Sequence, residues 1–212
     1  MAQKARSLGA NDAGCYTAIC MGIFELLKWI VPSGLLVVTV LRMLFRPRLS
    51  IEYANDDRFL QTTKRYDWGR EINGVRLRIM VFNRGLLPGK NCAVYVEGIW
   101  RDGVELSRRR LQLAWDDVGF GLHLLPRGKN SGKFARVCSS DQYTQALQIS
   151  CETPSASELR FTEEGCYKLK ILAYSPDFWV SSAEMSMDFS YSRAWPQITG
   201  IRTCKPWLSW RW

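Results

Sequence analysis

The sequence has a single histidine and lacks several motifs that would identify a metal site or an enzyme. None of its seven cysteines forms a C-x-x-C pair, the spacing that zinc ribbons and dithiol redox sites use. It also contains no Asn-x-Ser/Thr acceptor for N-glycosylation. Thiols without such acceptors are typical of a reducing compartment. The alternative, an extracytoplasmic domain, would need disulfides such as Cys138 with Cys151, and the sequence leaves that pairing open.

No group of residues has the pattern of a catalytic site. A triad needs a nucleophile and an orienting acid, and nothing in the sequence places either beside His123. The segment 128–134 differs from a phosphate-binding loop, because three residues separate its glycines and Phe134 replaces the magnesium-binding Ser/Thr. Asp116 and Asp117 are expected in a helix cap or loop rather than in a calcium site. We therefore expect no enzyme, cofactor or metal, with a hydrolase using His123 as an alternative.

A long apolar stretch is present near the N-terminus, from Cys15 to Phe45. A membrane-spanning helix needs about 20 residues. One window of that length, 22–41, includes Glu25 and Lys28, which share a helix face and can pair. The other, 26–45, has Lys28 and Arg42 near its ends, where they can reach the headgroups, although Trp29 would then be buried. Pro32 predicts a kink, because proline is tolerated in membrane helices.

The basic residues Arg46 and Arg48 follow this stretch directly. A cleaved signal peptide would need a small-x-small cleavage site, which the stretch lacks. A buried soluble helix, or a hairpin broken at residues 32–34, are further alternatives. Flanking Lys and Arg are more numerous behind the stretch than before it, which favours a cytoplasmic C-terminal domain. The sequence thus predicts an N-terminal tail over 1–14, and a single-pass anchor with its basic flank over 15–48.

The rest of the chain, 49–204, has the pattern of a β domain without a helical period. Apolar and polar residues alternate over 49–53, 75–81, 167–174 and 185–191, as in half-buried strands. Residues 92–100, 104–111, 134–138, 146–151 and 159–161 are further strand candidates, and Asp102-Gly103 predicts a hairpin turn. The polar segment 55–70 and the glycine-rich segment 116–132 are expected to be loops. Seven to nine short strands predict a mainly β fold, an antiparallel sandwich.

Period 2 within the strands also predicts a shared core. The side chains expected to face it are branched or aromatic. They are Val75, Leu77, Ile79, Val81, Val94, Val96, Leu169, Ile171 and Phe189.

Two segments resemble a known family. Residues 76–85 and 89–96 resemble the V-x-N-x-G-x-x-x-A-x-N hairpin of CARDB-like and other immunoglobulin-like bacterial domains, with Gly89 where that pattern usually has alanine. Gly165-Cys166-Tyr167 resembles the start of a late sandwich strand that carries a tyrosine corner. The resemblance implies an antiparallel immunoglobulin-like β-sandwich and an adhesive or scaffolding role. It supplies no catalytic residues.

Charge and the last eight residues bear on partners. The formal net charge is +9, of which residues 49–212 carry +5, and 108–110 is the only run of three arginines, which argues against nucleic acid. A tail over 205–212 combines tryptophans with basic residues, which suits a membrane interface or a partner groove. Its candidate contact residues are Lys205, Trp207, Trp210, Arg211 and Trp212.

The sequence thus predicts a membrane-anchored, non-enzymatic binding or scaffold protein that contacts membrane lipid and a protein partner. It specifies no small-molecule ligand. The alternative from another setting is an extracytoplasmic adhesion or envelope module.

Overall fold

The computed structural model describes residues 36–41, 46–117, 119, 122–151, 159–176, 181–195 and 197–204. The chain divides into two compact units, Met1–Leu44 and Phe45–Trp212. In the first unit, the described residues 36–41 are helical and their apolar side chains are exposed. Within the described part of the chain, no helix has the length and apolar character needed to cross a bilayer.

Most of the predicted anchor and the whole predicted tail lie outside the described residues. This applies to Glu25, Lys28, Trp29, Pro32 and Arg42, and to Lys205, Trp207, Trp210, Arg211 and Trp212. The single-pass anchor over 15–48 and the contact role of 205–212 therefore stay predictions.

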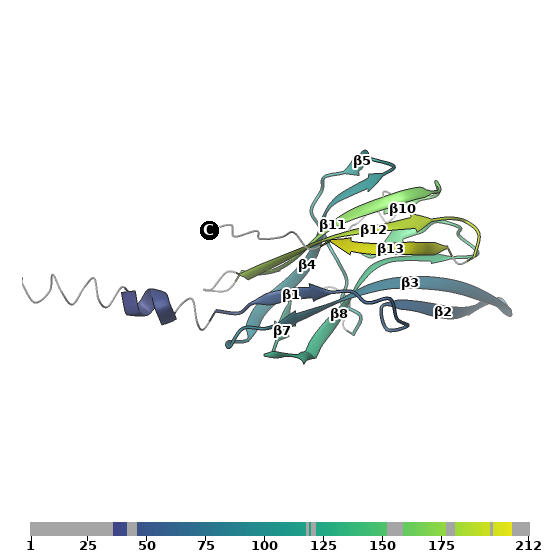
Figure 1. Cartoon of the computed structure of the whole chain (residues 1–212). Coiled ribbons are helices and arrows are strands. Elements are labelled where there is room, and N and C mark those ends of the chain that lie inside the picture. Colours follow the sequence, from purple (N-terminus) through teal and green to yellow (C-terminus); the bar gives the residue numbers. More distant parts are fainter. Residues whose placement is uncertain are drawn as a thin grey trace, which may run out of the picture. The chain divides into compact units, whose positions relative to one another are not determined.

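The second unit is mainly β, with two antiparallel sheets that share one core (Figure 1). The six-stranded sheet has the order β1-β3-β8-β9-β10, and β2 pairs with β3. Its strands are β1 (Leu49–Glu52), β2 (Leu60–Asp67), β3 (Arg70–Asn83), β8 (Gly128–Asp141), β9 (Leu147–Ile149) and β10 (Arg160–Phe161). The seven-stranded sheet has the order β13-β12-β11-β4-β5, and β6 and β7 pair with β4. Its strands are β4 (Gly89–Arg101), β5 (Val104–Ser107), β6 (Leu111–Gln112), β7 (His123–Leu125), β11 (Gly165–Ser175), β12 (Ser181–Tyr191) and β13 (Ile198–Cys204).

The core confirms the predicted period-2 pattern. All nine side chains expected to face it belong to one buried cluster, and strands of both sheets contribute to that cluster. Leu77 and Ile79 of β3 are fully buried, as are Leu169 and Ile171 of β11. When one face of a strand is buried, apolar and polar side chains must alternate along it. The alternation in the sequence therefore predicted which side chains form the core.

Two predicted loops are wrong. Residues 55–70 contain strand β2, and 116–132 contain β7 and the first residues of β8. The distal part of β2 is exposed on both faces, so burial imposes no apolar period on it. In β8, Gly128–Lys133 extends beyond the buried positions, which hid the strand in the same way. The sequence also did not predict β13, whose residues are mostly exposed.

The chain enters the β unit through a fixed contact around Asn83. The buried Asn83 side chain accepts hydrogen bonds from the backbone N–H groups of Arg48 and Gly85, both at 2.8 Å. Its amide donates to the carbonyl oxygen of Leu87 at 2.6 Å. A Cβ on Gly85 would lie 2.3 Å from the carbonyl oxygen of Arg46, so only glycine allows this approach. Arg46 and Arg48, the predicted basic flank, are exposed at this junction.

Tyr167 anchors the start of β11. Its ring is fully buried, and its hydroxyl donates to the carbonyl oxygen of Glu163, four residues upstream, at 2.8 Å. This is the backbone bond by which a tyrosine corner is defined. Burial raises the pKa of this hydroxyl above its ordinary value.

Candidate functional site

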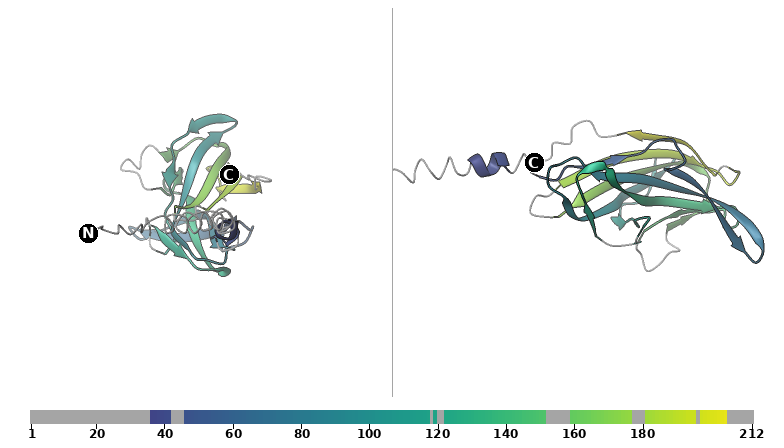
Figure 2. Two further views of the ribbon diagram at one scale, coloured as in Figure 1. Left: turned by 90° about the vertical axis from the view of Figure 1, so that its left-hand side faces the viewer. Right: turned by 90° about the horizontal axis from the view of Figure 1, so that it is seen from below.

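A long hairpin formed by β2 and β3 extends past the rest of its sheet (Figures 1 and 2). β3 loses its other neighbour at Gly74, which pairs with Asp141, the last residue of β8. Space at Gly74 is limited, because an added Cβ would lie 2.8 Å from the Thr63 hydroxyl oxygen. Beyond this point Asn73 still accepts a hydrogen bond from the Gln142 N–H at 3.0 Å, and the two strands pair with each other as far as Asp67 and Arg70. The end of the hairpin is therefore a two-stranded ribbon outside the core.

The turn of this hairpin places a tryptophan in an unfavourable backbone conformation. Trp68 and Gly69 have φ values of 49° and 76°, both in the left-handed region. Two-residue hairpin turns of this kind favour Asn, Asp or Gly, which tolerate positive φ. The β4–β5 hairpin follows that rule, with Asp102 and Gly103 at 50° and 82°. Trp68 breaks the rule, and its side chain is 98% exposed, so packing within the described structure does not compensate the strain.

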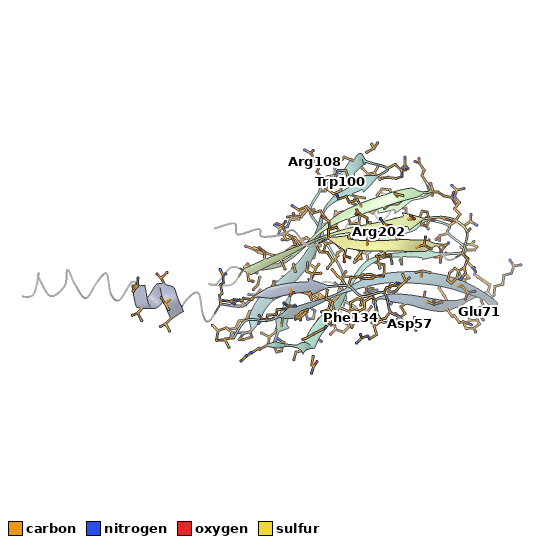
Figure 3. All side chains as sticks on the ribbon, in the orientation of Figure 1. Asp57, Glu71, Trp100, Arg108, Phe134 and Arg202 are labelled. Carbon is orange, nitrogen blue, oxygen red and sulfur yellow. The ribbon has the colours of Figure 1, made fainter. Side chains whose placement is uncertain are left out.

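The ribbon beside Trp68 is aromatic and mixed in charge. Tyr66 is 70% exposed, and its hydroxyl donates to the Glu71 carboxylate at 3.2 Å. Lys64 also pairs with Glu71, at 2.6 Å, and this hydrogen bond is the main cause of the lowered pKa of Glu71. Figure 3 labels Glu71 at this end of the molecule. Residues 64–71 hold three basic and two acidic side chains. The site thus offers two exposed rings on a nearly neutral ribbon.

Sequence reasoning missed this site, because it treated 55–70 as a loop. One local signal was available. Trp68-Gly69 stands between two polar segments, and glycine is one of the residues that most often mark a turn. The polar strand pattern on either side gave no reason to read that turn as a hairpin.

A cavity of about 420 Å³ lies over the seven-stranded sheet. Its lining residues are Trp100, Gly103, Lys168, Lys170 and Ser186. The Trp100 ring covers Gly98, where an added Cβ would lie 2.3 Å from the indole. Lys170 pairs with Glu97 at 3.0 Å and with Glu184 at 3.8 Å.

The residues considered for catalysis lie on β7 and on the turn before it. His123 lies in β7, with its ring 4.9 Å from the buried Trp115 ring. Asp117 pairs with Lys133, and this hydrogen bond is the main cause of its lowered pKa. The charge of His123 also contributes to lowering the pKa of Asp117, and a hydrolase that uses His123 stays an alternative. Arg110, in the run of three arginines over 108–110, has its guanidinium carbon 4.1 Å from the centre of the Tyr95 ring.

The cysteines and acidic residues were also considered for metal and disulfide chemistry. Cys138, Cys166 and Cys204 are free thiols, so the Cys138–Cys151 pair does not form. Burial raises the pKa of the Cys138 thiol, which keeps it protonated and unreactive. In the part of the chain that the structure describes, no three His, Cys, Asp or Glu side chains are grouped to hold a metal.

Comparisons with known proteins add no relative. Neither the family models, nor the curated proteins, nor the solved structures include a match to this chain.

Proposed function

We propose that this protein is a membrane-anchored, non-enzymatic binding or scaffold protein. In this proposal an immunoglobulin-like β domain presents the β2–β3 hairpin to a protein partner. The observation that carries the proposal is Trp68, which is almost wholly exposed in a turn that disfavours it.

The strain at Trp68 is the physical argument. A left-handed backbone costs a residue with a Cβ roughly 1–2 kcal/mol, and an exposed indole adds further unfavourable hydration. Sequences that break a local rule without a folding gain tend to do so where the protein functions. Tryptophan and tyrosine are also the residues most enriched at binding hot spots. A partner that buries the Trp68 and Tyr66 rings would remove their apolar surface from water, and this gain would offset the cost of the strained turn.

The position of the turn favours contact with a partner protein over contact with the membrane that would hold the anchor. Leu49, where the chain enters the β unit, pairs with Asn83 at the far end of β3. β3 has 14 residues, and at about 3.4 Å per residue it is roughly 45 Å long. Arg46, where the chain enters the unit, thus lies at the end of the β unit opposite the hairpin turn. The mixed charge of residues 64–71 suits a partner with an apolar pocket and a weakly acidic rim.

The predicted anchor and tail are consistent with one another. β13 runs back toward the end where β1 begins (Figure 1), and it ends at Cys204, opposite Ser186 of β12. Ser181 lies five residues before Ser186, at the start of β12. Its hydroxyl accepts a hydrogen bond from the Leu49 N–H at 3.1 Å. The tail over 205–212 therefore starts roughly 17 Å from this end. Eight residues can span up to about 29 Å, so a segment of this length can cover that distance.

Two further observations support the setting. The two antiparallel sheets and the Tyr167 hydroxyl bond are features of immunoglobulin-like sandwiches. The free thiols of Cys138, Cys166 and Cys204 suit a reducing cytoplasm. Labelling the exposed Cys166 and Cys204 in intact and in lysed cells tests this side of the membrane. If these two cysteines are labelled as fully in intact cells as in lysed cells, the result would instead favour the adhesion or envelope alternative.

The test of the hairpin uses the full chain in its own membranes. A photoreactive amino acid at position 68 should crosslink to a protein partner, and the same amino acid at Tyr143 should not. Tyr143 is the matched control because it is also an exposed aromatic residue, at 80%. The variant Trp68→Asn places at this position a residue that the turn favours. We expect it to lose the partner that the wild type retains on purification, while Tyr143→Asn retains it.

The stability of Trp68→Asn separates loss of binding from loss of folding. We expect its melting temperature to equal or exceed that of the wild type, because strain is removed and no buried surface is lost. The proposal is wrong if Trp68→Asn retains the same partners as the wild type, or if position 68 crosslinks only to lipid.

A further inference from the structure

Three arginines surround one carboxylate on the outer face of the six-stranded sheet. Arg78 of β3 pairs with Asp116 at 2.6 Å, and Arg76, two residues earlier, approaches the other carboxylate oxygen at 3.5 Å. The Nε of Arg136, from β8, lies 3.7 Å from that same oxygen. Figure 3 labels Phe134, which lies on this face two residues before Arg136. We call Arg76, Arg78, Asp116 and Arg136 the arginine cluster.

The strand register forces this cluster together. Arg78 and Arg136 are direct cross-strand partners, next to a register shift between Leu77 and Arg78. Like charges in directly opposite positions destabilise a sheet. Irregularities of this kind re-aim side chains, and they are frequent beside functional sites. The register therefore places two cations where an isolated sheet would disfavour them.

The carboxylate between them is held in place by the backbone. The Asp116 N–H donates to the Phe134 carbonyl oxygen at 2.9 Å. The Arg136 N–H donates to the Ala114 carbonyl oxygen at 2.8 Å, and its guanidinium donates to the Trp115 carbonyl oxygen at 3.2 Å. Asp116 cannot move away from the arginines without breaking these bonds.

One carboxylate does not neutralise three guanidinium groups. The cluster carries a formal charge of +2, and its side chains are only 12–34% exposed. The Nε donors of Arg78 and Arg136 and one carboxylate oxygen of Asp116 are buried, and none of the three forms a hydrogen bond within the described structure. Partly desolvated positive charge of this size favours a counter-anion.

The three arginines have different roles. Arg78 is the least exposed, at 12%, and it is held by Asp116, by the Arg58 carbonyl oxygen and by the Phe134 ring, 4.7 Å away. It is a structural clamp. Arg76 and Arg136 are 34% and 29% exposed, so part of each guanidinium group remains open to a ligand from solvent, although the Nε of Arg136 is buried.

We propose that the arginine cluster is a binding site for a phosphate group in its dianionic form, with Arg76 and Arg136 as the ligand-binding residues. Guanidinium groups match the oxygens of phosphate in pairs, and arginine is the residue best suited to such recognition. A dianion would cancel the formal charge of the cluster. The phosphate can be free or can be carried by a lipid headgroup, because both present the same oxygens.

The first experiment measures binding of inorganic phosphate to the full chain in detergent, by calorimetric titration and by the rise in melting temperature. The reference is sodium chloride at matched ionic strength. We expect the wild type to be stabilised by phosphate beyond chloride, as mass action requires for a ligand of the native state. Arg76→Gln and Arg136→Gln should each weaken phosphate binding at least tenfold. Arg84→Gln is the matched control, because it removes one exposed arginine at the end of β3, outside the cluster.

A second variant separates a phosphate site from a purely structural clamp. Asp116→Asn removes the negative charge that a bound anion must approach. We expect it to lower the melting temperature and yet to tighten phosphate binding several-fold. A structural clamp predicts the lower melting temperature with no gain in binding.

The source of the phosphate is tested with vesicles. Phosphatidylcholine vesicles with and without phosphatidic acid are compared for binding of the wild type and of Arg136→Gln. A preference for phosphatidic acid that Arg136→Gln lacks identifies a lipid headgroup. Binding of inorganic phosphate without that preference identifies a soluble source.

Equal phosphate and chloride effects in the wild type would overturn the proposal, as would equal phosphate binding by Arg136→Gln and Arg84→Gln. These results would leave the hairpin proposal unaffected, because the arginine cluster and Trp68 share no residue.

Discussion

Asn83 offers the sharpest test of how the chain is joined to the β unit. Its side chain is fully buried and makes four hydrogen bonds with backbone groups. Two of them satisfy the N–H groups of Arg48 and Gly85, and two reach the carbonyl oxygens of Leu87 and Leu125. Asn83→Ala removes all four without creating a large cavity.

The expected loss of stability follows from the groups left without partners. A buried donor that loses its acceptor costs about 1–3 kcal/mol, and the variant leaves one buried N–H group, that of Gly85, and one part-buried N–H group, that of Arg48. We expect the free energy of unfolding to fall by about 3 kcal/mol. For a unit of this size each kcal/mol lowers the melting temperature by about 2–4 °C, so the expected fall is about 6–12 °C. Thermal and urea unfolding followed by circular dichroism measures both quantities.

Asn83→Asp refines the test through pH. Ionised, this aspartate would direct a carboxylate oxygen at the Leu87 carbonyl oxygen, now 2.6 Å from the amide nitrogen. Burial and this contact should raise its native pKa above the unfolded value of about 3.9. A raised pKa means that stability is retained below pH 4 and is lost as the pH rises through the native pKa.

The exposed Asn130 supplies the control, since Asn130→Asp should follow the wild type at every pH. If Asn83→Ala costs less than about 1 kcal/mol, or if Asn83→Asp follows the wild type as the pH rises, our account of this junction is wrong.

Four further predictions can be checked on the same material. Ile79→Ala should cost about 2–5 kcal/mol, since Ile79 is fully buried. Met80→Ala, on the outer face of the same strand, should cost far less, and equal losses would contradict the register. Burial raises the native pKa of the Cys138 thiol above its ordinary value of 9.0, so this group destabilises the protein at alkaline pH. Cys138→Ala should lack that contribution. Above pH 9 the wild type should lose about 1.4 kcal/mol per pH unit from this group, and identical slopes in both proteins would refute its role. Phe45–Trp212 should fold and melt cooperatively without the preceding residues, which a soluble chain with no melting transition would disprove. Deleting 205–212 should leave the melting temperature nearly unchanged and weaken binding to anionic vesicles, where basic residues contribute about 1 kcal/mol each; a large fall in melting temperature would instead indicate a tail packed on the β unit.

The structure changes two of the choices that sequence reasoning suggests for such tests. Arg78 alternates with Ile79 and looks like a tolerant outward position. It is instead held in the arginine cluster, so Met80 is the better control. A fragment that starts at Leu49 also removes Arg46 and Arg48, whose backbone packs against Gly85 and Asn83. Starting at Phe45 preserves that contact.

The sequence by itself determined the mainly β character of the unit, the shared core and the Asp102-Gly103 hairpin. These features are local: burial of one strand face imposes period 2, and a left-handed turn selects Asp and Gly. The same reasoning failed for β2, for the start of β8 and for β13, because exposed strand segments experience no such selection.

Only the tertiary structure decided the two proposed sites. Arg76 and Arg136 are far apart in the chain, and a register shift between β3 and β8 brings them to one carboxylate from a separate loop. Trp68 is an ordinary aromatic residue in the sequence. Its exposure and its strained backbone exist only once β2 has paired with β3. Register and exposure are properties of strands meeting in space, so no local pattern along the chain encodes them.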